Sequence, residues 1–376
     1  MRTVLILMGR YLPGHKDGGP LRTIINVTEA LGDEYDFKIV TLDRDHGDTV
    51  PYDAIRREQW NAVGKAKVWY VSPGEFTFKA LCRFAKEADM IYCCGFYDDY
   101  GYKTLILNRL GRLFGKPVVV ASMGVFSPGA LSQKSLKKKV FISFCKLAGL
   151  FRNIRWSVTS AMEEGELKRV IGASAVCTIA EDLPRTHIPG RAVSVRRAGD
   201  PLKIVFLSRI CRMKNLLFAV RALQQLKVRA HFCVYGPKED EEYWRQCEKE
   251  LEYLPENVTW EYRGDVPSEQ VPFVFGGHDV FLFPTKGENY GHVIFEALSA
   301  GCVPIISDQT PWQIVAEQQA GYVLPLGDPQ VFADAVESFA ALSAEKRAEV
   351  SRKAITVAAD KVKTAMEETG YRTIFG

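Results

Sequence analysis

The chain has 376 residues, of which 47% are hydrophobic and 25% are charged, a composition that is ordinary for a globular protein and excludes a fibrous or disordered one. This length exceeds the usual size of one hydrophobic core, so we expect two domains. The net charge of +4 is unevenly spread, because residues 1–190 carry 27 Lys/Arg against 20 Asp/Glu and the remainder carries 22 against 25. We therefore expect the first half to be the part that meets an anionic surface or substrate.

The nine cysteines are scattered and form no C-x-x-C pair, which favours a reduced compartment over a disulfide framework. The apolar run at the start of the chain leads into glycines and charges without a cleavage site, so it is typical of a core strand and not of a signal peptide. No stretch approaches the roughly 20 apolar residues of a membrane span. These features predict a cytoplasmic protein, with peripheral contact at the inner face of the plasma membrane left open.

Short apolar, β-branched runs alternate with helical patterns along residues 1–183. Strands that are apolar on both faces and alternate with helices predict a parallel sheet covered on both sides. The expected strands are Thr3–Leu7, Phe37–Thr41, Lys67–Tyr70, Met90–Tyr92, Val118–Ala121 and Trp156–Val158, and the expected helices include Pro20–Leu31, Phe78–Glu87 and Tyr102–Leu113.

The alternation lapses over residues 184–200, which are rich in Pro, Gly and Arg, and we interpret this segment as an interdomain linker. It resumes over residues 201–357, which predicts a second doubly wound α/β domain, and a helical pattern follows at Ala358–Ile374. In such sheets ligands bind at the carboxyl ends of the strands. The strands expected in the second domain are Lys203–Leu207, His231–Tyr235, Val258–Tyr262, Val280–Phe283 and Val303–Ser307.

The segment from Gly287 to Ser307 carries the strongest functional signal. Glu288 follows a predicted strand, and Glu296 lies eight positions later on the helix that should start near Asn289–Gly291. A helix N-terminus beside glycines is an anion site, and ionised carboxylates are strong acceptors for sugar and ribose hydroxyls.

This segment resembles the glycosyltransferase family 4 group, also called the glycosyl transferases group 1. The family pattern of two glutamates separated by seven residues and followed by an Ala-x-Gly-x-Pro turn is similar to Glu288, Glu296 and Ala300–Pro304 here. The resemblance implies the GT-B fold, with two Rossmann-like doubly wound parallel-sheet domains facing a cleft and a C-terminal helix, residues 358–376, that crosses back to the first domain.

The resemblance also implies a reaction. It is the transfer of a hexose from a nucleoside diphosphate sugar to a glycan or polyprenyl-diphosphate-linked acceptor. The anomeric configuration of the hexose is retained, and no metal or other cofactor is required. A UDP-sugar is favoured over a GDP-sugar, and the setting is bacterial surface polysaccharide or glycoconjugate synthesis. No nucleic acid partner is expected. The alternatives are a nucleotide-sugar epimerase on the same scaffold and a non-catalytic nucleotide-sugar-binding or scaffold subunit.

Residues of the donor site follow from the same resemblance. Arg209 and Lys214, five apart after a strand, are similar to the family pair that binds the donor diphosphate, and a leaving diphosphate needs positive charge beside it. Glu288 would orient the donor sugar, Glu296 the ribose, and N–H groups near Tyr290 would help to hold the phosphates. Further donor contacts are implied for Gly19, Gly236, Pro237, Arg263, Gly264, Val266, Asn289 and Gly291.

In the first domain, Gly18 and Gly19 lie just before a helix that includes Arg22, and the pair resembles the family loop that meets donor phosphate and acceptor. Many family members have a His-Gly pair at the end of a strand facing the reacting sugar. Met123-Gly124 occupies that place here, and no histidine lies between residues 47 and 186. Another group would have to supply that role, or the correspondence is displaced by one strand.

Residues 131–155 hold seven Lys/Arg and no acidic residue, with an apolar face at Leu136, Val140, Phe144, Leu147 and Phe151. This pattern fits a helix lying on an anionic membrane surface. It fits equally a domain helix whose apolar face enters the core. Lys134, Lys137 and Lys138 are the candidate contacts to a membrane or to the phosphates of the acceptor.

Two other features of the sequence bear on metal binding. Asp43-Arg44-Asp45 matches an Asp-x-Asp metal motif, but we expect a solvated loop there. The spacing of Cys and His predicts no zinc site.

Overall fold

The computed structural model describes residues 1–15, 18–127, 130–131, 135–185 and 200–376. The chain divides into two compact units, Met1–Thr186 with Thr364–Gly376 and His187–Lys363. The boundary near the C-terminus falls within α13 (Ala344–Glu368). The linker predicted at 184–200 lies outside the described residues except at positions 184, 185 and 200.

The first unit is built on an eight-stranded sheet of order β3-β4-β2-β1-β5-β6-β7-β8. Its strands pair in parallel except at one edge, where β3 runs antiparallel to β4. The strands are β1 (Arg2–Met8), β2 (Tyr35–Leu42), β3 (Trp60–Val63), β4 (Ala66–Val71), β5 (Met90–Cys94), β6 (Val118–Ala121), β7 (Ile154–Val158) and β8 (Val176–Ile179).

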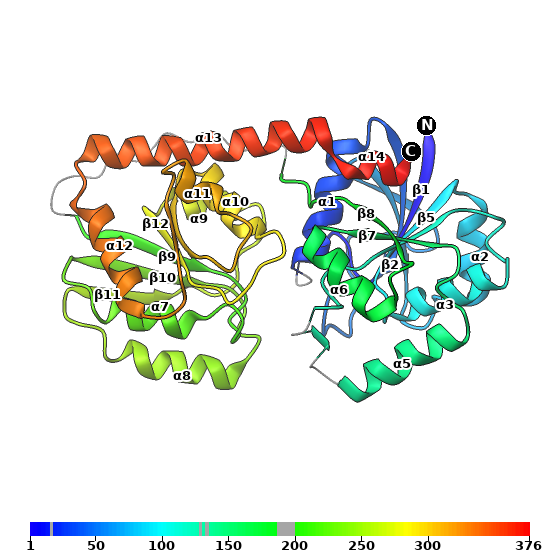
Figure 1. The fold of residues 1–376 in the computed structure, drawn as a ribbon, viewed down its shortest axis with the longest axis horizontal. Coiled ribbons are helices and arrows are strands. Elements are labelled where there is room, and N and C mark those ends of the chain that lie inside the picture. Colours follow the sequence, from blue (N-terminus) through cyan, green and yellow to red (C-terminus); the bar gives the residue numbers. More distant parts are fainter. Residues whose placement is uncertain (16–17, 128–129, 132–134, 186–199) are drawn as a thin grey trace. The chain divides into compact units, whose positions relative to one another are not determined.

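Helices cover both faces of this sheet (Figure 1). Because side chains alternate along a strand, Val4 and Ile6 of β1 enter one core cluster while Leu5 and Leu7 enter the other. α1 and α14 pack on the first face, and α2, α3, α5 and α6 pack on the second. These helices are α1 (Gly19–Leu31), α2 (Phe78–Lys86), α3 (Asp99–Arg109), α5 (Ser135–Leu147), α6 (Ala161–Ile171) and α14 (Gly370–Phe375).

The second unit is built on a six-stranded parallel sheet of order β11-β10-β9-β12-β13-β14. The strands are β9 (Leu202–Leu207), β10 (Ala230–Tyr235), β11 (Val258–Tyr262), β12 (Val280–Phe283), β13 (Val303–Ser307) and β14 (Tyr322–Leu324). The helices are α7 (Leu216–Leu223), α8 (Glu241–Leu251), α9 (Val271–Gly276), α10 (His292–Ser299), α11 (Ile314–Glu317), α12 (Pro329–Ala341) and most of α13.

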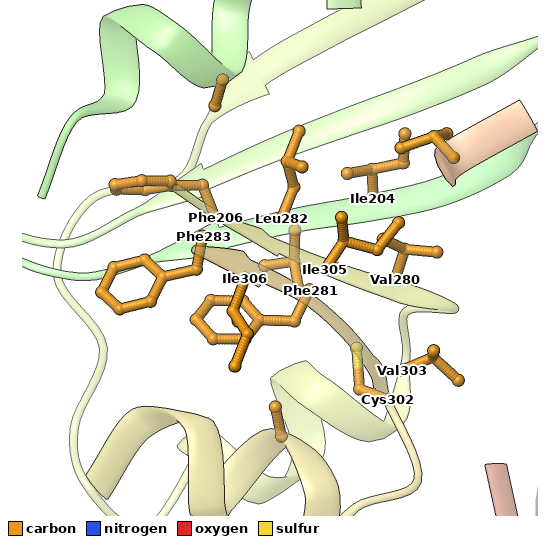
Figure 2. Packing of buried hydrophobic residues seen from close by; sticks show 14 of the residues in the cluster. Ile204, Phe206, Val280, Phe281, Leu282, Phe283, Cys302, Val303, Ile305 and Ile306 are labelled. Carbon is orange, nitrogen blue, oxygen red and sulfur yellow. The ribbon is translucent and has the colours of Figure 1, made fainter. Parts of the chain in front are cut away.

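Aromatic side chains fill the centre of the second core. Figure 2 shows Phe206 of β9 beside Phe283 of β12, with Phe281 of the same strand on the far side of Phe283. The rings of Phe281 and Phe283 are stacked, with centroids 5.0 Å apart and planes at 19°. This packing holds the carboxyl ends of β9 and β12 together, which is where the candidate site begins.

The eleven strands predicted from the sequence are confirmed, and the prediction of parallel sheets covered by helices holds for both units. Three strands were missed, and all are sheet edges: β3, β8 and β14. An edge strand is short and partly exposed, so it lacks the continuous apolar run that marks a central strand.

The helix predicted at Ala358–Ile374 is wrong as a single element. The first part belongs to the 25-residue α13, and a separate α14 follows. The break lies at Thr369, whose extended backbone and hydroxyl, which accepts from the Tyr371 N–H at 3.3 Å, form the N-cap of α14. α14 then packs on the first unit, where the Phe375 ring lies 5.5 Å from that of Phe37.

Candidate active site

The sheet of the second unit reverses its strand order between β9 and β12. At such a switch point the loops that leave the two neighbouring strands diverge, and ligands bind at the carboxyl edge between them. The loop after β9 carries Arg209 and Lys214, and the loop after β12 carries Glu288. The predicted donor residues therefore flank this point of the second unit.

Lys214 and Glu288 form an ion pair across the switch point. Only 14% and 12% of their side chains are exposed, so the pair is better shielded from solvent screening than a surface ion pair. The Lys214 ammonium also lies 5.8 Å from the Phe283 ring centroid. The structure thus brings together two of the three residues for which catalytic roles were predicted.

Hydrogen bonds between the two loops hold this pair in place. Asn215 adopts a left-handed conformation (φ 61°) as the N-cap of α7, and its side-chain amide donates to the Pro284 carbonyl at 2.9 Å. The Lys286 N–H donates to the Met213 carbonyl at 2.8 Å. The Thr285 hydroxyl lies 3.5 Å from a Glu288 carboxylate oxygen. Sequence reasoning missed Asn215 and Thr285, although Asn directly before a helix is itself an N-cap signal.

Arg209 has a different partner. Its guanidinium pairs with Glu239, which follows the β10 loop, and 47% of each side chain is exposed. Arg209 is therefore held beside the Gly236-Pro237 turn and is not part of the Lys214–Glu288 pair. An exposed pair of this kind is weak, so this cation can change partners at little cost.

The loops predicted to hold the nucleotide base lie next to each other at the ends of β10 and β11. The Gly236 N–H donates to the Gly264 carbonyl at 2.8 Å, and the Tyr262 hydroxyl donates to the Gly236 carbonyl at 2.9 Å. Gly236 (φ 125°) packs against the Ser208 carbonyl, so that a Cβ there would lie 1.9 Å from its oxygen. Pro237 continues this turn, and its carbonyl accepts from the Ile210 N–H at 2.9 Å.

Beyond Gly264, two more predicted contacts have their own partners. The Arg263 guanidinium is 2.7 Å from the Glu261 carboxylate. The Val266 N–H bonds to the Asp265 side chain at 2.9 Å. The Arg263 side chain is 56% exposed, so this pair is also a weak one, and the role predicted for this loop rests mainly on its backbone groups.

The helix that follows Glu288 begins where the sequence indicated. Gly291 is the left-handed N-cap of α10 (φ 79°), which has no side-chain cap. Tyr290 is buried, and its carbonyl accepts from the Trp312 indole N–H. Asn289 is exposed, and Glu296 is half-buried in the second turn of the helix. The first N–H groups of α10, which have no side-chain cap, are of the kind that binds an anion.

In the first unit, Gly18 has φ 61° and is the N-cap of α1, and its carbonyl accepts from the Arg22 N–H at 3.2 Å. A Cβ at Gly19 would meet nothing within 4 Å. Met123 (φ 45°) and Gly124 (φ 74°) form a left-handed turn after β6. Gly18 and Met123 thus follow two strands of the same sheet that are separated by β5.

A buried carboxylate, missed by sequence reasoning, supports the Met123-Gly124 turn. Glu163 of α6 is 3% exposed. It accepts hydrogen bonds from the Ser122 hydroxyl at 2.7 Å, from the Gly124 N–H, and from the N–H and hydroxyl of Thr159 at 2.6 and 2.8 Å. A carboxylate with four donors is fully satisfied, so Glu163 fixes the turn in the place where the family commonly has His-Gly.

Asp182 is a second buried carboxylate that sequence reasoning missed. Burial raises its pKa to about 7, although a hydrogen bond from Thr23 opposes the shift, and the nearby charges of Glu163 and Glu181 add to it. It precedes Leu183, whose carbonyl accepts from the Asn26 side chain of α1 at 2.7 Å. The group therefore lies against the helix that begins at Gly19.

The three lysines predicted to meet a membrane or acceptor separate in the structure. Lys134 lies outside the described residues. Lys137 is exposed on α5, whereas the Lys138 ammonium donates to the Ala130 carbonyl and lies 5.4 Å from the Tyr97 ring centroid. Among the described residues, no helix has the length and apolarity needed to cross a membrane.

The Asp43-Arg44-Asp45 loop is not solvated, which corrects the sequence prediction. Asp43 is fully buried and pairs with Arg44 at 2.8 Å and with Arg57 at 3.2 Å. Burial would raise the Asp43 pKa, but hydrogen bonds from Arg44 and Ser72 outweigh it and hold the pKa below its usual value. Asp45 is 4% exposed and accepts from the His15 N–H at 2.8 Å. Both carboxylates are thus bound by groups of the chain itself.

Among the described residues, one group of potential metal ligands comes together, and residue spacing had not predicted it: His231, Cys233 and Glu261 on β10 and β11. One Glu261 oxygen lies 3.1 Å from His231 Nε2, 3.3 Å from Cys233 Sγ and 2.7 Å from the Arg263 guanidinium. Arg263 is the main cause that lowers the Glu261 pKa to about 2. Burial raises the pKa of the Cys233 thiol to about 12.

Two α/β units built on parallel sheets form the architecture of the GT-B fold. Sucrose-phosphate synthase from Thermosynechococcus elongatus has the same fold, with a TM-score of 0.74 and 17% identity over 100% of this chain and 99% of that one. Anabaena Alr3699/HepE in complex with UDP-glucose has a TM-score of 0.68 and 15% identity over 100% and 99%.

Residues 192–357 match the family model described as Glycosyl transferases group 1. The match places a domain of this family in the second unit. A curated relative is the putative colanic acid biosynthesis glycosyltransferase WcaL of Salmonella typhimurium, which is 29% identical over 161 residues. That alignment spans 39% of this chain and 38% of the relative.

Proposed function

We propose that the chain transfers a hexose from a nucleoside diphosphate sugar, UDP in preference to GDP, to a glycan or lipid-linked acceptor in the synthesis of a bacterial surface polysaccharide or glycoconjugate. The name of the Salmonella relative, a colanic acid biosynthesis glycosyltransferase, supports the setting. The Anabaena protein, which binds UDP-glucose in its crystal structure, supports the donor class. The transfer proceeds with retention of the anomeric configuration of the hexose and without a metal ion.

The Lys214–Glu288 pair is the observation that carries this proposal. When the bond from the sugar to the diphosphate breaks, negative charge grows on the leaving phosphate, and a cation held in a partly buried place stabilises it. An ammonium has three donors, so Lys214 can bind a phosphate oxygen while it stays paired with Glu288. Glu288 keeps a second oxygen for a hydroxyl of the donor sugar.

Arg209 supplies a second positive charge by exchanging Glu239 for a phosphate oxygen. The exchange costs little free energy because the Arg209–Glu239 pair is half-exposed. The turns at Gly236 and Gly264 offer backbone groups to the base, and Glu296 on α10 accepts from the ribose. With two cations and the N-terminus of α10 beside the diphosphate, the site provides the charge that a divalent metal provides in other transferases.

Retention follows if the acceptor hydroxyl attacks from the side that the leaving group departs from. In that geometry the leaving phosphate oxygen takes the acceptor proton, so no side chain of the first unit has to act as the base. This accounts for Met123 in the place of a histidine. The acceptor is then held by the first unit, whose excess of Lys/Arg suits a diphosphate-linked lipid at the inner face of the membrane.

Donor binding tests the proposal most directly. The thermal midpoint of the protein is measured with UDP, UDP-glucose, GDP and GDP-mannose, and a bound nucleotide at 100 times its Kd stabilises by about 2.7 kcal/mol. Lys214→Ala should lose the shift, whereas Lys249→Ala, an exposed lysine of α8, should keep it. NMR of the product made from a lipid-linked glycan acceptor then distinguishes an α-retained glycoside from an epimerised or hydrolysed donor. An identical shift for Lys214→Ala and the parent would contradict the proposed site.

A further inference from the structure

The outer face of α5 is apolar and exposed. Four side chains spaced along one side of the helix have large exposed fractions: Leu136 74%, Val140 62%, Phe144 57% and Leu147 92%. They recur at steps of four, four and three residues, so they form one stripe along α5. We call these four residues the α5 stripe. Exposed apolar surface of this extent marks an interaction site.

The α5 stripe is not the face by which the helix packs on its own unit. That face is formed by Ile142 and Cys145, which are 6% and 0% exposed, together with half-buried Phe141. Phe151, which the sequence pattern grouped with the stripe, lies beyond the end of α5 and packs on Trp156 with ring centroids 5.8 Å apart. The alternative that this predicted apolar face enters the core of the domain is therefore wrong for the four stripe residues.

The end of α3 adds to the same surface. Leu110 and Phe114 directly follow α3 and are 65% and 51% exposed. The Asn108 side chain donates to the Arg152 carbonyl at 3.2 Å, which ties this end of α3 to the loop that follows α5. Figure 1 shows the two helices on one side of the unit. Exposed apolar side chains thus occur on two neighbouring elements of the first unit.

The stretch of chain that carries this surface holds charges of one sign only. Between Asp99 and Glu163 the sequence contains eleven Lys/Arg and no acidic residue. Most of those in the described residues are exposed: Arg109, Arg112, Lys137, Lys139, Lys146 and Arg152. Because no carboxylate in this stretch neutralises them, they attract an anionic surface.

We propose that the α5 stripe and the end of α3 dock this protein on an anionic lipid bilayer. Leu and Phe side chains enter the boundary between head groups and acyl chains, and the surrounding Lys/Arg bind lipid phosphates. A second copy of the chain fits this surface poorly, because two faces with the same uncompensated positive charge repel each other. A nucleic acid would pair with the cations but would leave the stripe in water.

This docking does not depend on the transfer reaction, although it would bring the first unit to a lipid-linked acceptor. Vesicle binding needs neither donor nor acceptor, so it can fail while transfer succeeds, and the reverse also holds. The full chain is sedimented with sucrose-loaded vesicles of phosphatidylcholine alone and of phosphatidylcholine with 30% phosphatidylglycerol, at low and high salt. We expect binding to the anionic vesicles, weakened by salt.

Two double variants separate the apolar and charged parts. Phe144→Gln with Leu147→Gln should lower the partition coefficient by at least about tenfold, because two of the inserting apolar side chains become polar. Lys139→Glu with Lys146→Glu should lower it by a similar factor. The matched controls are Tyr253→Gln with Phe273→Gln, two exposed apolar residues of the second unit, and Lys249→Glu with Lys346→Glu. All these side chains are exposed, so we expect the variants to keep the thermal midpoint of the parent. A lowered midpoint would show that a variant binds less because it is less stably folded.

The proposal is overturned if the parent protein binds neither vesicle at low salt, or if the stripe variant binds as well as its control. Sedimentation equilibrium of the parent and the stripe variant is run alongside. A dimer that the stripe variant abolishes, without vesicle binding, would assign the surface to a second copy and reject the membrane.

Discussion

Lys214 and Glu288 are 74 positions apart in the sequence and meet as a partly buried ion pair where the loops of β9 and β12 diverge. Asn215 and Thr285 donate hydrogen bonds that connect the same two loops. The ion pair is therefore one of several links between these loops. The first prediction follows from this arrangement.

Lys214→Ala should lower kcat/KM for glycosyl transfer by about 10²–10³, the usual cost of removing one group that stabilises a developing oxyanion. Glu288→Gln should lower it as well, since a neutral amide is a weaker acceptor and leaves Lys214 without its partner. The double variant should lose less than the product of the two single losses, because the residues act as a unit. Steady-state kinetics of the four proteins gives the coupling. Independent, multiplicative losses would show that the pair has no joint role.

Gly236→Ala should destabilise the second unit strongly. Its φ of 125° and a Cβ position 1.9 Å from the Ser208 carbonyl oxygen leave no room for a side chain without a shift of the backbone. We expect a cost of about 3 kcal/mol, seen as a drop of roughly 6 to 12 °C in the thermal midpoint. Gly264→Ala is the matched control, because its φ is also positive but no atom lies within 4 Å of the added Cβ. Equal effects would mean that contact with Ser208 does not matter.

The parts of this fold that the sequence predicts are those where burial is complete. Central strands such as Val118–Ala121 and Val280–Phe283 are buried along their whole length, so an apolar run marks their bounds. The missed β3 and β8 are edge strands with exposed or half-buried positions. Their pairing depends on a neighbouring strand, and the sequence of the strand itself carries little of that information.

The closeness of two site residues can be predicted only where the order of the strands in the sheet determines it. The loops after two adjacent parallel strands leave the same edge of the sheet, so Lys214 and Glu288 could be expected near each other. Glu239 is the partner of Arg209 because of the rotamers that the two side chains adopt, and the sequence pattern does not predict rotamers. α5 shows a further limit, because its sequence has two apolar sides, one with Leu136 and one with Ile142. Helical periodicity picked out the side with Leu136, whereas the side with Ile142 packs inward.

A chelator should leave donor binding and transfer unchanged. The proposed diphosphate site has Lys214 and Arg209 as its cations, and Asp43 and Asp45 are engaged by groups of the chain. Activity is measured after dialysis against EDTA and again with added Mn²⁺. Glu261→Gln serves as a control for the His231–Cys233–Glu261 group, and it should change neither activity nor metal content. Loss of transfer in EDTA that Mn²⁺ restores would contradict a metal-independent mechanism.

Asp182→Asn should stabilise the protein at alkaline pH and change it little at acidic pH. The folded pKa of Asp182, about 7, lies above its unfolded value of 3.8, so the folded state holds a proton that the unfolded state releases. The stability from this group is fully present below pH 3.8 and is lost as pH rises through 7, by up to about 4 kcal/mol at pH 8. Asparagine cannot ionise, so the thermal midpoint of the variant should rise relative to that of the parent from pH 5 to pH 8. The midpoints are measured by thermal unfolding followed by circular dichroism. Asp360→Asn, at an exposed position of α13, should show no such trend. A constant difference between Asp182→Asn and the parent at every pH would mean that Asp182 is ionised in the folded protein throughout this range.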